Sequence, residues 1–485
     1  MIPKRVQWFL GFLFCPLVSG GQNFPIDRIF YQNLPFVAQL HEYSYLLQKG
    51  QPTFYEAGLG YTSRLGIREQ PFDTHHLSQA YFQSASVMEL GSWMMAGNFN
   101  YHKTLRSKRP YLLQTADWGV VPYRLMDKDI QPWSGDEVSF QVGFSSPEYG
   151  SEKRWQTVGN LAYEVGTHTR NAEPRPLART NRYIIGLGQN FRTGAYTSVS
   201  AGIQLLSAKE ENHIGSYAVQ DAEIYQGRGW GTFMRNIYQS FQRTQSLQGT
   251  NVSFAMQYRK VAVHAFTEMK FKTKSYEARD GVAFPLNGGA ARMKGLRWTG
   301  GLDFSLNGIG QIESLLSIDS ERLSGNDPVF NAINVEGDFR KVSWVNIANL
   351  GAGKDWQAEF QLQYRTDNSE DLAAREQVSI SVFSLKASVL KRFGLGKSLF
   401  YINPSVETWN AKSDLVYDSS KEISHLLLGP QQAFYSRSFL EPGLGAKWMV
   451  PLSDENKLLV GSRYSHRLSR SYPLHEFSFF TQLLF

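Results

Sequence analysis

The sequence predicts an all-β fold, in which a single chain closes into one antiparallel transmembrane β-barrel. Three observations favour this fold: the composition, long segments of alternating polarity, and an aromatic final strand. Of the 485 residues, 14% are aromatic, only 19% are charged, and 42 are glycine. The mean hydropathy is −0.35, and no apolar run reaches the ~18 residues of a membrane helix. This composition is typical of a large β protein and excludes a helical membrane protein.

The segment 355–365 shows the alternation most clearly. Trp356, Phe360 and Tyr364 fall on one face and Gln361 on the other, because successive side chains of a strand point to opposite sides. Such segments run for nine to twelve residues, longer than the roughly five to six residues of an average strand. A tilted strand needs ~9–11 residues to cross a bilayer. The length therefore favours a membrane barrel over a soluble β-sandwich.

The last strand carries the most specific signal in the chain. Phe477, Phe479, Leu483 and the terminal Phe485 occupy alternate positions and so share one face. This pattern resembles the C-terminal signature of bacterial outer-membrane β-barrels, in which the barrel-assembly machinery reads it as a signal. The resemblance implies a location in the bacterial outer membrane, with membrane lipid and the barrel-assembly machinery as partners.

The connections between segments predict the number of strands. Counted back from the C-terminus, short turns alternate with long loops, as in barrels with short periplasmic turns and long outer loops. The count is eighteen strands from about Phe54 to Phe485. Fourteen or sixteen stay open, because the turns near Gly91 and Arg259 are weak. Eighteen strands imply a radius of about 18 Å, so strand side chains alone cannot fill the interior. The predicted long loops include 103–136, 207–248, 273–294, 319–338 and 411–433.

Residues 1–52 precede the predicted barrel, which spans 53–485. A short basic region, an apolar stretch and small residues after it predict a signal peptide over 1–21. The segment 22–52 is largely apolar, and we expect it to form either a plug in the barrel or a periplasmic segment. The one cysteine, Cys15, lies in the leader, so the mature chain is expected to have no disulfide.

The predicted loop 207–248 offers a candidate pore constriction. Its apolar residues between Met234 and Phe241 follow helical spacing. Folded inward, the loop would place Arg228, Arg235 and Arg243 against an anionic solute, since guanidinium groups bind anions well. The alternative is an outer lid that carries ordinary surface arginines.

No catalytic, metal-binding or cofactor-binding motif stands out. His75 and His76 are adjacent, so in a strand their rings point apart. The net charge is only +7, from 50 basic and 43 acidic residues, and it is dispersed, which argues against nucleic-acid binding. We therefore expect a protein that is not an enzyme and that needs no cofactor and no metal.

The leader, the segment before the first strand and the aromatic strands also resemble an uncharacterised family of Bacteroidota outer-membrane barrels. Members of that family tend to be encoded beside TonB-dependent receptors. Two functions follow as expectations. The first is a passive or substrate-selective pore for small solutes. The second, implied by the resemblance, is a non-enzymatic accessory barrel that works beside a TonB-dependent uptake receptor. A barrel enzyme is a third possibility that no residue spacing supports.

Overall fold

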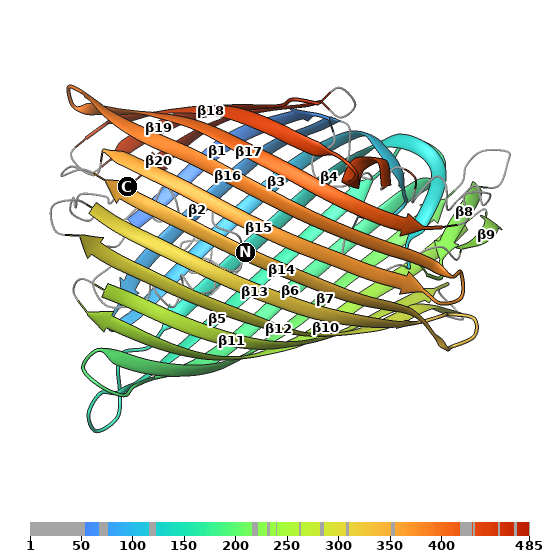
Figure 1. The fold of residues 1–485 in the computed structure, drawn as a ribbon, viewed down its shortest axis with the longest axis horizontal. Coiled ribbons are helices and arrows are strands. Elements are labelled where there is room, and N and C mark those ends of the chain that lie inside the picture. The colour runs from blue at the N-terminus through green and yellow to red at the C-terminus, as the bar shows by residue number, and fades with distance from the viewer. Residues whose placement is uncertain are drawn as a thin grey trace, which may run out of the picture.

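The computed structural model shows one large β-barrel (Figure 1). The predicted signal peptide 1–21, the predicted plug or periplasmic segment 22–52 and the terminal Phe485 lie outside the described residues. The described residues are 54–66, 76–115, 123–215, 222–229, 233–238, 240–260, 263–281, 286–306, 310–350, 355–417, 429, 432–453, 456–469 and 473–484.

Eighteen long strands form the barrel wall, and two further short strands form a hairpin that is not part of the wall. The hairpin strands are β8 (Ala222–Gly227) and β9 (Phe233–Tyr238). The wall strands are β1 (Phe54–Leu65), β2 (His76–Leu90), β3 (Trp93–Leu112), β4 (Leu125–Ser145), β5 (Trp155–Thr169), β6 (Arg175–Arg192), β7 (Thr197–Gly215), β10 (Ser240–Lys260), β11 (Val263–Asp280), β12 (Leu286–Leu306), β13 (Gly310–Asn326), β14 (Ile333–Leu350), β15 (Trp356–Asp371), β16 (Glu376–Leu395), β17 (Ser398–Val416), β18 (Ser438–Pro451), β19 (Lys457–Arg467) and β20 (Leu474–Leu484).

The wall is antiparallel throughout and closes on itself. Each strand pairs with the next, β7 pairs with β10 across the hairpin, and β1 pairs with both β2 and β20. The predicted strand number of eighteen is confirmed. The two weak turns separate real strands: β2 ends at Leu90 before β3 begins at Trp93, and β10 ends at Lys260 before β11 begins at Val263.

The strands run well beyond the positions where the sequence predicted long loops. Within the predicted loop 273–294, β11 and β12 stay paired from Thr273↔Lys294 to Asp280↔Leu286. Within 319–338, β13 still pairs with β14. Outside the bilayer the outer face needs no apolar side chains, so the alternation stops although backbone pairing continues. The predicted loop boundaries were wrong for this reason.

The two faces of the wall differ in polarity as predicted for 355–365. On β15, Trp356 and Tyr364 are 47% and 44% exposed on the outside, whereas Gln357 is buried on the inside. A band of exposed apolar side chains surrounds the barrel on the outward face. It includes Leu161, Tyr183, Ile185, Leu187, Ile203, Phe254, Met256, Met269, Phe271, Trp344, Phe383, Val389, Leu444, Trp448, Phe477 and Phe479.

The barrel has a turn end and a loop end. The turn end carries short connections such as the one between β2 and β3. The loop end, on the right in Figure 1, carries the β8–β9 hairpin and a helical turn over 432–435. In the described part of the chain, no helix has the length and apolar character that a membrane crossing requires.

Candidate functional site

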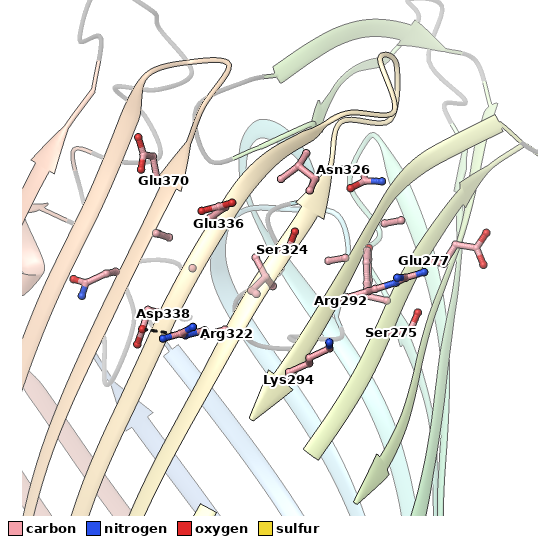
Figure 2. A pocket seen from close by; sticks show the side chains of 18 of the residues that line it. Ser275, Glu277, Arg292, Lys294, Arg322, Ser324, Asn326, Glu336, Asp338 and Glu370 are labelled. Carbon is pink, nitrogen blue, oxygen red and sulfur yellow. Dashed lines mark ion pairs between the residues drawn. The ribbon is translucent and has the colours of Figure 1, made fainter. Parts of the chain in front are cut away.

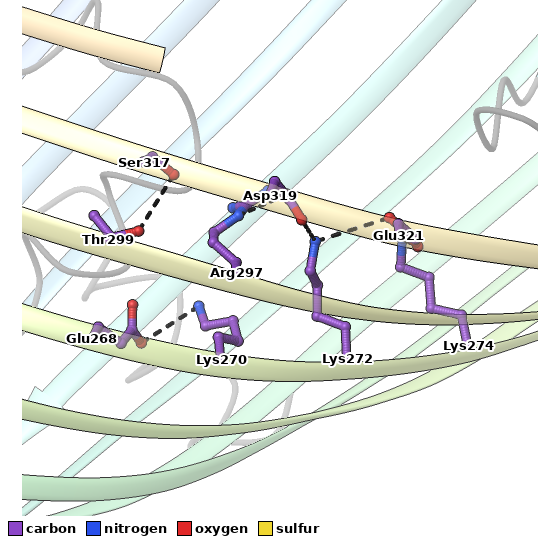
Figure 3. Close-up of polar contacts among 9 residues, drawn as sticks. All are labelled: Glu268, Lys270, Lys272, Lys274, Arg297, Thr299, Ser317, Asp319 and Glu321. Atoms are coloured by element: carbon purple, nitrogen blue, oxygen red, sulfur yellow. Dashed lines mark hydrogen bonds and ion pairs between the residues drawn. The ribbon is translucent and has the colours of Figure 1, made fainter. Parts of the chain in front are cut away.

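A ladder of charged side chains lines the inner wall on β11, β12 and β13 (Figure 3). The Lys272 Nζ lies 2.5 Å from Asp319 Oδ1, and the Arg297 Nε donates to Asp319 Oδ2 at 2.7 Å. Lys274 Nζ pairs with Glu321 Oε1 at 2.6 Å. Asp319 thus pairs with two cations, Lys272 and Arg297. Most cations of the ladder are therefore neutralised by carboxylates within it.

The ladder lies at the height of the apolar band. Lys270 and Lys272 point inward from β11, and Lys270 Nζ is 3.7 Å from Glu268 Oε1. Met269 and Phe271, which alternate with them, are 41% and 47% exposed on the outer face. The lumen at membrane height is therefore polar and charged, and it carries both signs.

Residues 113–115, which follow β3, and 123–124, which precede β4, lie in the loop end of the lumen. We call these residues the inner strap. The Tyr123 side chain is fully buried, and its hydroxyl donates to the carbonyl oxygens of Ala290 at 3.0 Å and Asn326 at 2.8 Å. Its ring stacks on Tyr276 with centroids 5.9 Å apart. These contacts lie on β11–β13, which are not neighbours of β3 or β4, so the strap crosses the interior.

Glycines make room for this tyrosine. Gly289 has a φ of +129°, and a Cβ there would lie 2.4 Å from the Tyr123 ring. A Cβ on Gly325 would lie 2.4 Å from the Tyr123 hydroxyl. Burial raises the pKa of Tyr123, so its phenol stays neutral and keeps its role as a donor.

Polar side chains on the inner wall hold the strap in place. The Thr115 amide donates to Glu210 Oε1 at 2.8 Å, and Gln245 Nε2 donates to Gln114 Oε1 at 3.1 Å. Arg243, which is 1% exposed, donates to both carboxylate oxygens of Asp280 at 2.5 and 2.7 Å. Its third nitrogen donates to the Tyr123 carbonyl oxygen at 3.2 Å.

The β8–β9 hairpin is fastened to the wall at two places. β8 pairs with the start of β4. Just beyond this pairing, Arg228 Nη2 donates to both carboxylate oxygens of Asp327 at 2.8 and 2.7 Å, and Asn334 Nδ2 donates to the Arg228 carbonyl oxygen at 2.7 Å. We call the Arg228–Asp327 pair the clasp. It ties the hairpin to the β13–β14 connection.

A second buried apolar cluster lies at the loop end, and it includes residues of the β17–β18 connection. Phe434 and Tyr435, in the helical turn 432–435, are buried against the inward side chains Val378, Ile380 and Val382. The other cluster at this end forms around Tyr123. Two buried apolar clusters thus lie at the loop end, whereas the lumen below is charged.

The structure gives the three predicted constriction arginines different surroundings. Arg228 forms the clasp, and Arg243 anchors the inner strap. Arg235 is exposed on β9 and pairs with Glu223 of β8. The spacing from Met234 to Phe241 predicted a helix, but these positions belong to β9 and β10. Periodicity over so few residues fits either element, and pairing between β8 and β9 decided it.

Sequence reasoning missed Tyr123, Asp327 and Asp319. Tyr123 lies in a segment without periodicity, and the two carbonyl oxygens that its hydroxyl contacts are more than 160 residues away in sequence. The glycines Gly289 and Gly325 were the one available signal, since close approach of another group is a common reason for glycine within a strand. In the described part of the chain, no group of three or more His, Cys, Asp or Glu residues is arranged to hold a metal ion.

Solved structures with a similar outline are bacterial outer-membrane proteins at low identity. The ferric preacinetobactin receptor BauA from Acinetobacter baumannii has a TM-score of 0.41 and 7% identity, covering 90% of this chain and 80% of that chain. The ferric yersiniabactin uptake receptor FyuA from Yersinia pestis has a TM-score of 0.40 and 7% identity, with the same coverage. The RagAB peptide transporter has a TM-score of 0.44 and 6% identity, covering 90% and 87%.

In sequence, no curated protein is detectably similar to this chain. A family model described as a family of unknown function (DUF6850) matches residues 44–482. Because this match spans most of the 485 residues, the chain belongs to the DUF6850 family.

Proposed function

We propose that this protein is a gated pore of the bacterial outer membrane that passes small charged solutes. The observation that carries the proposal is the contrast between an apolar outer band and a charged inner wall in one closed barrel. A charged inner wall favours a water-filled lumen, in which charged solutes can stay hydrated. The ladder pairs Lys272 and Arg297 with Asp319, so it offers both signs and suits zwitterions or ions of either charge.

The inner strap supplies the gate in this proposal. The Tyr123 hydroxyl donates to the carbonyl oxygens of Ala290 and Asn326, and its ring stacks on Tyr276. All three partners lie on β11–β13. Releasing this one side chain removes the strap from β11–β13 without breaking any wall strand. The proposal contains no catalytic step and no cofactor.

The proposed orientation follows from the barrel itself. Short connections gather at one end, which in single-chain outer-membrane barrels faces the periplasm. Phe477 and Phe479 are 45% and 44% exposed on the outer face of β20. With Leu483 and Phe485 they are our proposed assembly signal.

Planar-bilayer recording of the refolded protein tests the gate. We expect rare, brief openings for the unaltered barrel and a higher open probability for Tyr123→Ala. The matched control is Tyr183→Ala, which removes an outward, lipid-facing tyrosine. A further variant without residues 22–52 separates the strap from the predicted plug. If none of these proteins conducts, the pore proposal is wrong.

The closed loop end also favours a second candidate, a non-enzymatic accessory barrel beside a TonB-dependent receptor. Phe434 is fully buried, and the packing around it and Tyr123 resembles a protein core more than a pore mouth. This candidate predicts a larger membrane partner that co-purifies with the barrel and no conductance from any strap variant.

A further inference from the structure

The outer wall of β11–β15 is hollowed into a groove beyond the apolar band (Figure 2). Its volume is about 1260 Å³. Three cations line it, Arg292, Lys294 and Arg322, and all three are exposed. The Arg322 side chain is 79% exposed. The cations of the groove lie on the outer face, and no residue of the inward charge ladder lines it.

The strand register places the cations next to the apolar band. One row of cross-strand neighbours on the outer face is entirely apolar: Met269, Trp298, Ile318, Val342 and Tyr364. Two rows farther toward the loop end, Lys294 of β12 pairs directly with Arg322 of β13. Arg292 stands one row beyond Lys294 on the same face.

The cross-strand pair Lys294↔Arg322 is unfavourable by itself. Like charges directly opposite each other in a sheet destabilise it. Neither Lys294 nor Arg292 makes an ion pair among the described residues. Arg322 Nε is 3.7 Å from Asp338 Oδ2, but the Asp338 carboxylate accepts closer bonds from Arg340 at 2.9 and 3.1 Å.

The acidic residues of the groove are either paired or farther out. Glu277 is held by Arg279 at 2.8 Å. Glu336 and Glu370 are each one row beyond the row of Lys294 and Arg322. Lys294 and Arg322 therefore lie nearer the apolar band than Glu336 and Glu370, whereas Arg292 shares the outer row with these two carboxylates.

We propose that this groove binds the phosphorylated headgroup of a glycolipid in the outer leaflet. Arginine and lysine bind phosphate oxygens with charge-assisted hydrogen bonds, and an anion between Lys294 and Arg322 removes their repulsion. The apolar row of Trp298 and Ile318 lies where the acyl chains of the same lipid would run. A membrane lipid can contact the cations with its phosphate and the apolar row with its acyl chains, whereas a soluble phosphate can contact only the cations.

Binding of diphosphorylated lipid A to the delipidated barrel in detergent tests this site. The variant Arg292→Gln/Lys294→Gln/Arg322→Gln should bind about tenfold more weakly than the unaltered protein. The matched control, Arg179→Gln/Lys209→Gln, removes two outward cations of β6 and β7 and should stay within about twofold. Dephosphorylated lipid A should bind the unaltered protein no better than the triple variant binds the phosphorylated lipid.

Three outcomes would overturn the proposal. One is equal lipid A binding by the triple variant, checked to be folded by its heat-modifiable migration. Another is an equal loss of binding in the matched control, which would indicate diffuse attraction. The third is inorganic pyrophosphate that binds as tightly as the lipid and displaces it, which would assign the groove to a soluble anion. All are read in detergent without conductance, so they are independent of the pore proposal.

Discussion

The inner and outer faces of β11–β13 both carry cations, but the cations differ in whether a carboxylate pairs with them. On the inside, Lys272 and Lys274 each have a carboxylate oxygen within 2.6 Å. On the outside, Lys294 has no ion pair among the described residues and faces Arg322 across the sheet. Along the chain, Lys294 is only three residues from Arg297 of the ladder, and Arg322 is next to Glu321. The comparison shows that carboxylates of the protein neutralise the ladder cations, whereas Lys294 on the outer face has no such partner among the described residues.

The physical environments explain the difference. Charges inside the lumen are partly removed from water, where an unpaired charge is costly, so each cation of the ladder has an acidic neighbour. The outward cations lie beyond the apolar band and are exposed, so hydration or a lipid phosphate can compensate them. The predictions below start with the largest expected effect.

The strongest contrast between the faces is expected at membrane height on β15. Phe360→Arg should lower the free energy of unfolding by ~2–4 kcal/mol, because the new charge would face the hydrocarbon. Gln361→Arg places the same charge in the polar lumen and should cost far less. Denaturant unfolding of the two variants in lipid vesicles measures the difference. Equal losses would mean that the faces are assigned incorrectly.

The stability of the inner face should depend on the carboxylates that pair with its cations. Asp319→Asn leaves Lys272 and Arg297 without their principal partner. We expect a loss of roughly 2 kcal/mol in the free energy of unfolding, less than for a fully buried pair because the lumen admits water. Ser320→Asn, one residue away on the outer face, is the control and should change it by less than about 0.5 kcal/mol. A neutral Asp319→Asn variant would contradict the idea that the ladder is self-neutralised.

The clasp should weaken in acid. Although burial opposes the charged form, hydrogen bonds from Arg228 and from the Phe330 and Val329 amides lower the pKa of Asp327. A carboxyl with a lowered pKa stabilises the fold fully above its unfolded value of about 3.9, and this contribution is lost as the pH falls through the folded pKa. Its loss should amount to about 1.5 kcal/mol.

Limited proteolysis of the β8–β9 hairpin between neutral pH and pH 3 measures this effect. Cleavage should rise in acid for the unaltered protein. For Asp327→Asn it should be high at every pH, because the clasp has lost its charge throughout. A hairpin whose cleavage ignores pH in both proteins would rule out the clasp as its fastening.

The smallest expected effect is a gain on the outer face. Lys294→Glu replaces the like-charged pair with an opposite-charged pair to Arg322, which should raise the free energy of unfolding by about 0.2–1 kcal/mol in lipid-free detergent. The same change should weaken lipid A binding. A decrease in stability would show that Lys294 is already compensated within the protein.

The sequence alone predicted the barrel, its eighteen strands and the orientation of the strand faces. The reason is local: each crossing strand must show apolar side chains to lipid at every second position, so Trp356, Phe360 and Tyr364 reveal their face without knowledge of any partner. This reasoning does not apply to the parts of the strands beyond the bilayer, so their ends could not be predicted. Beyond Phe271 on β11 the outward residues are polar, and strand and loop look alike in sequence.

Only the tertiary structure showed which segments enter the lumen and which charges meet. Tyr123 reaches Asn326 across 203 positions of sequence, and Arg243 finds Asp280 only because β10 and β11 are in register. Lys294 and Arg322 become neighbours through the β12–β13 register in the same way. Local patterns determine the face of a side chain, because a strand alternates with a period of two, but its partner depends on strand register and on where the loops fold.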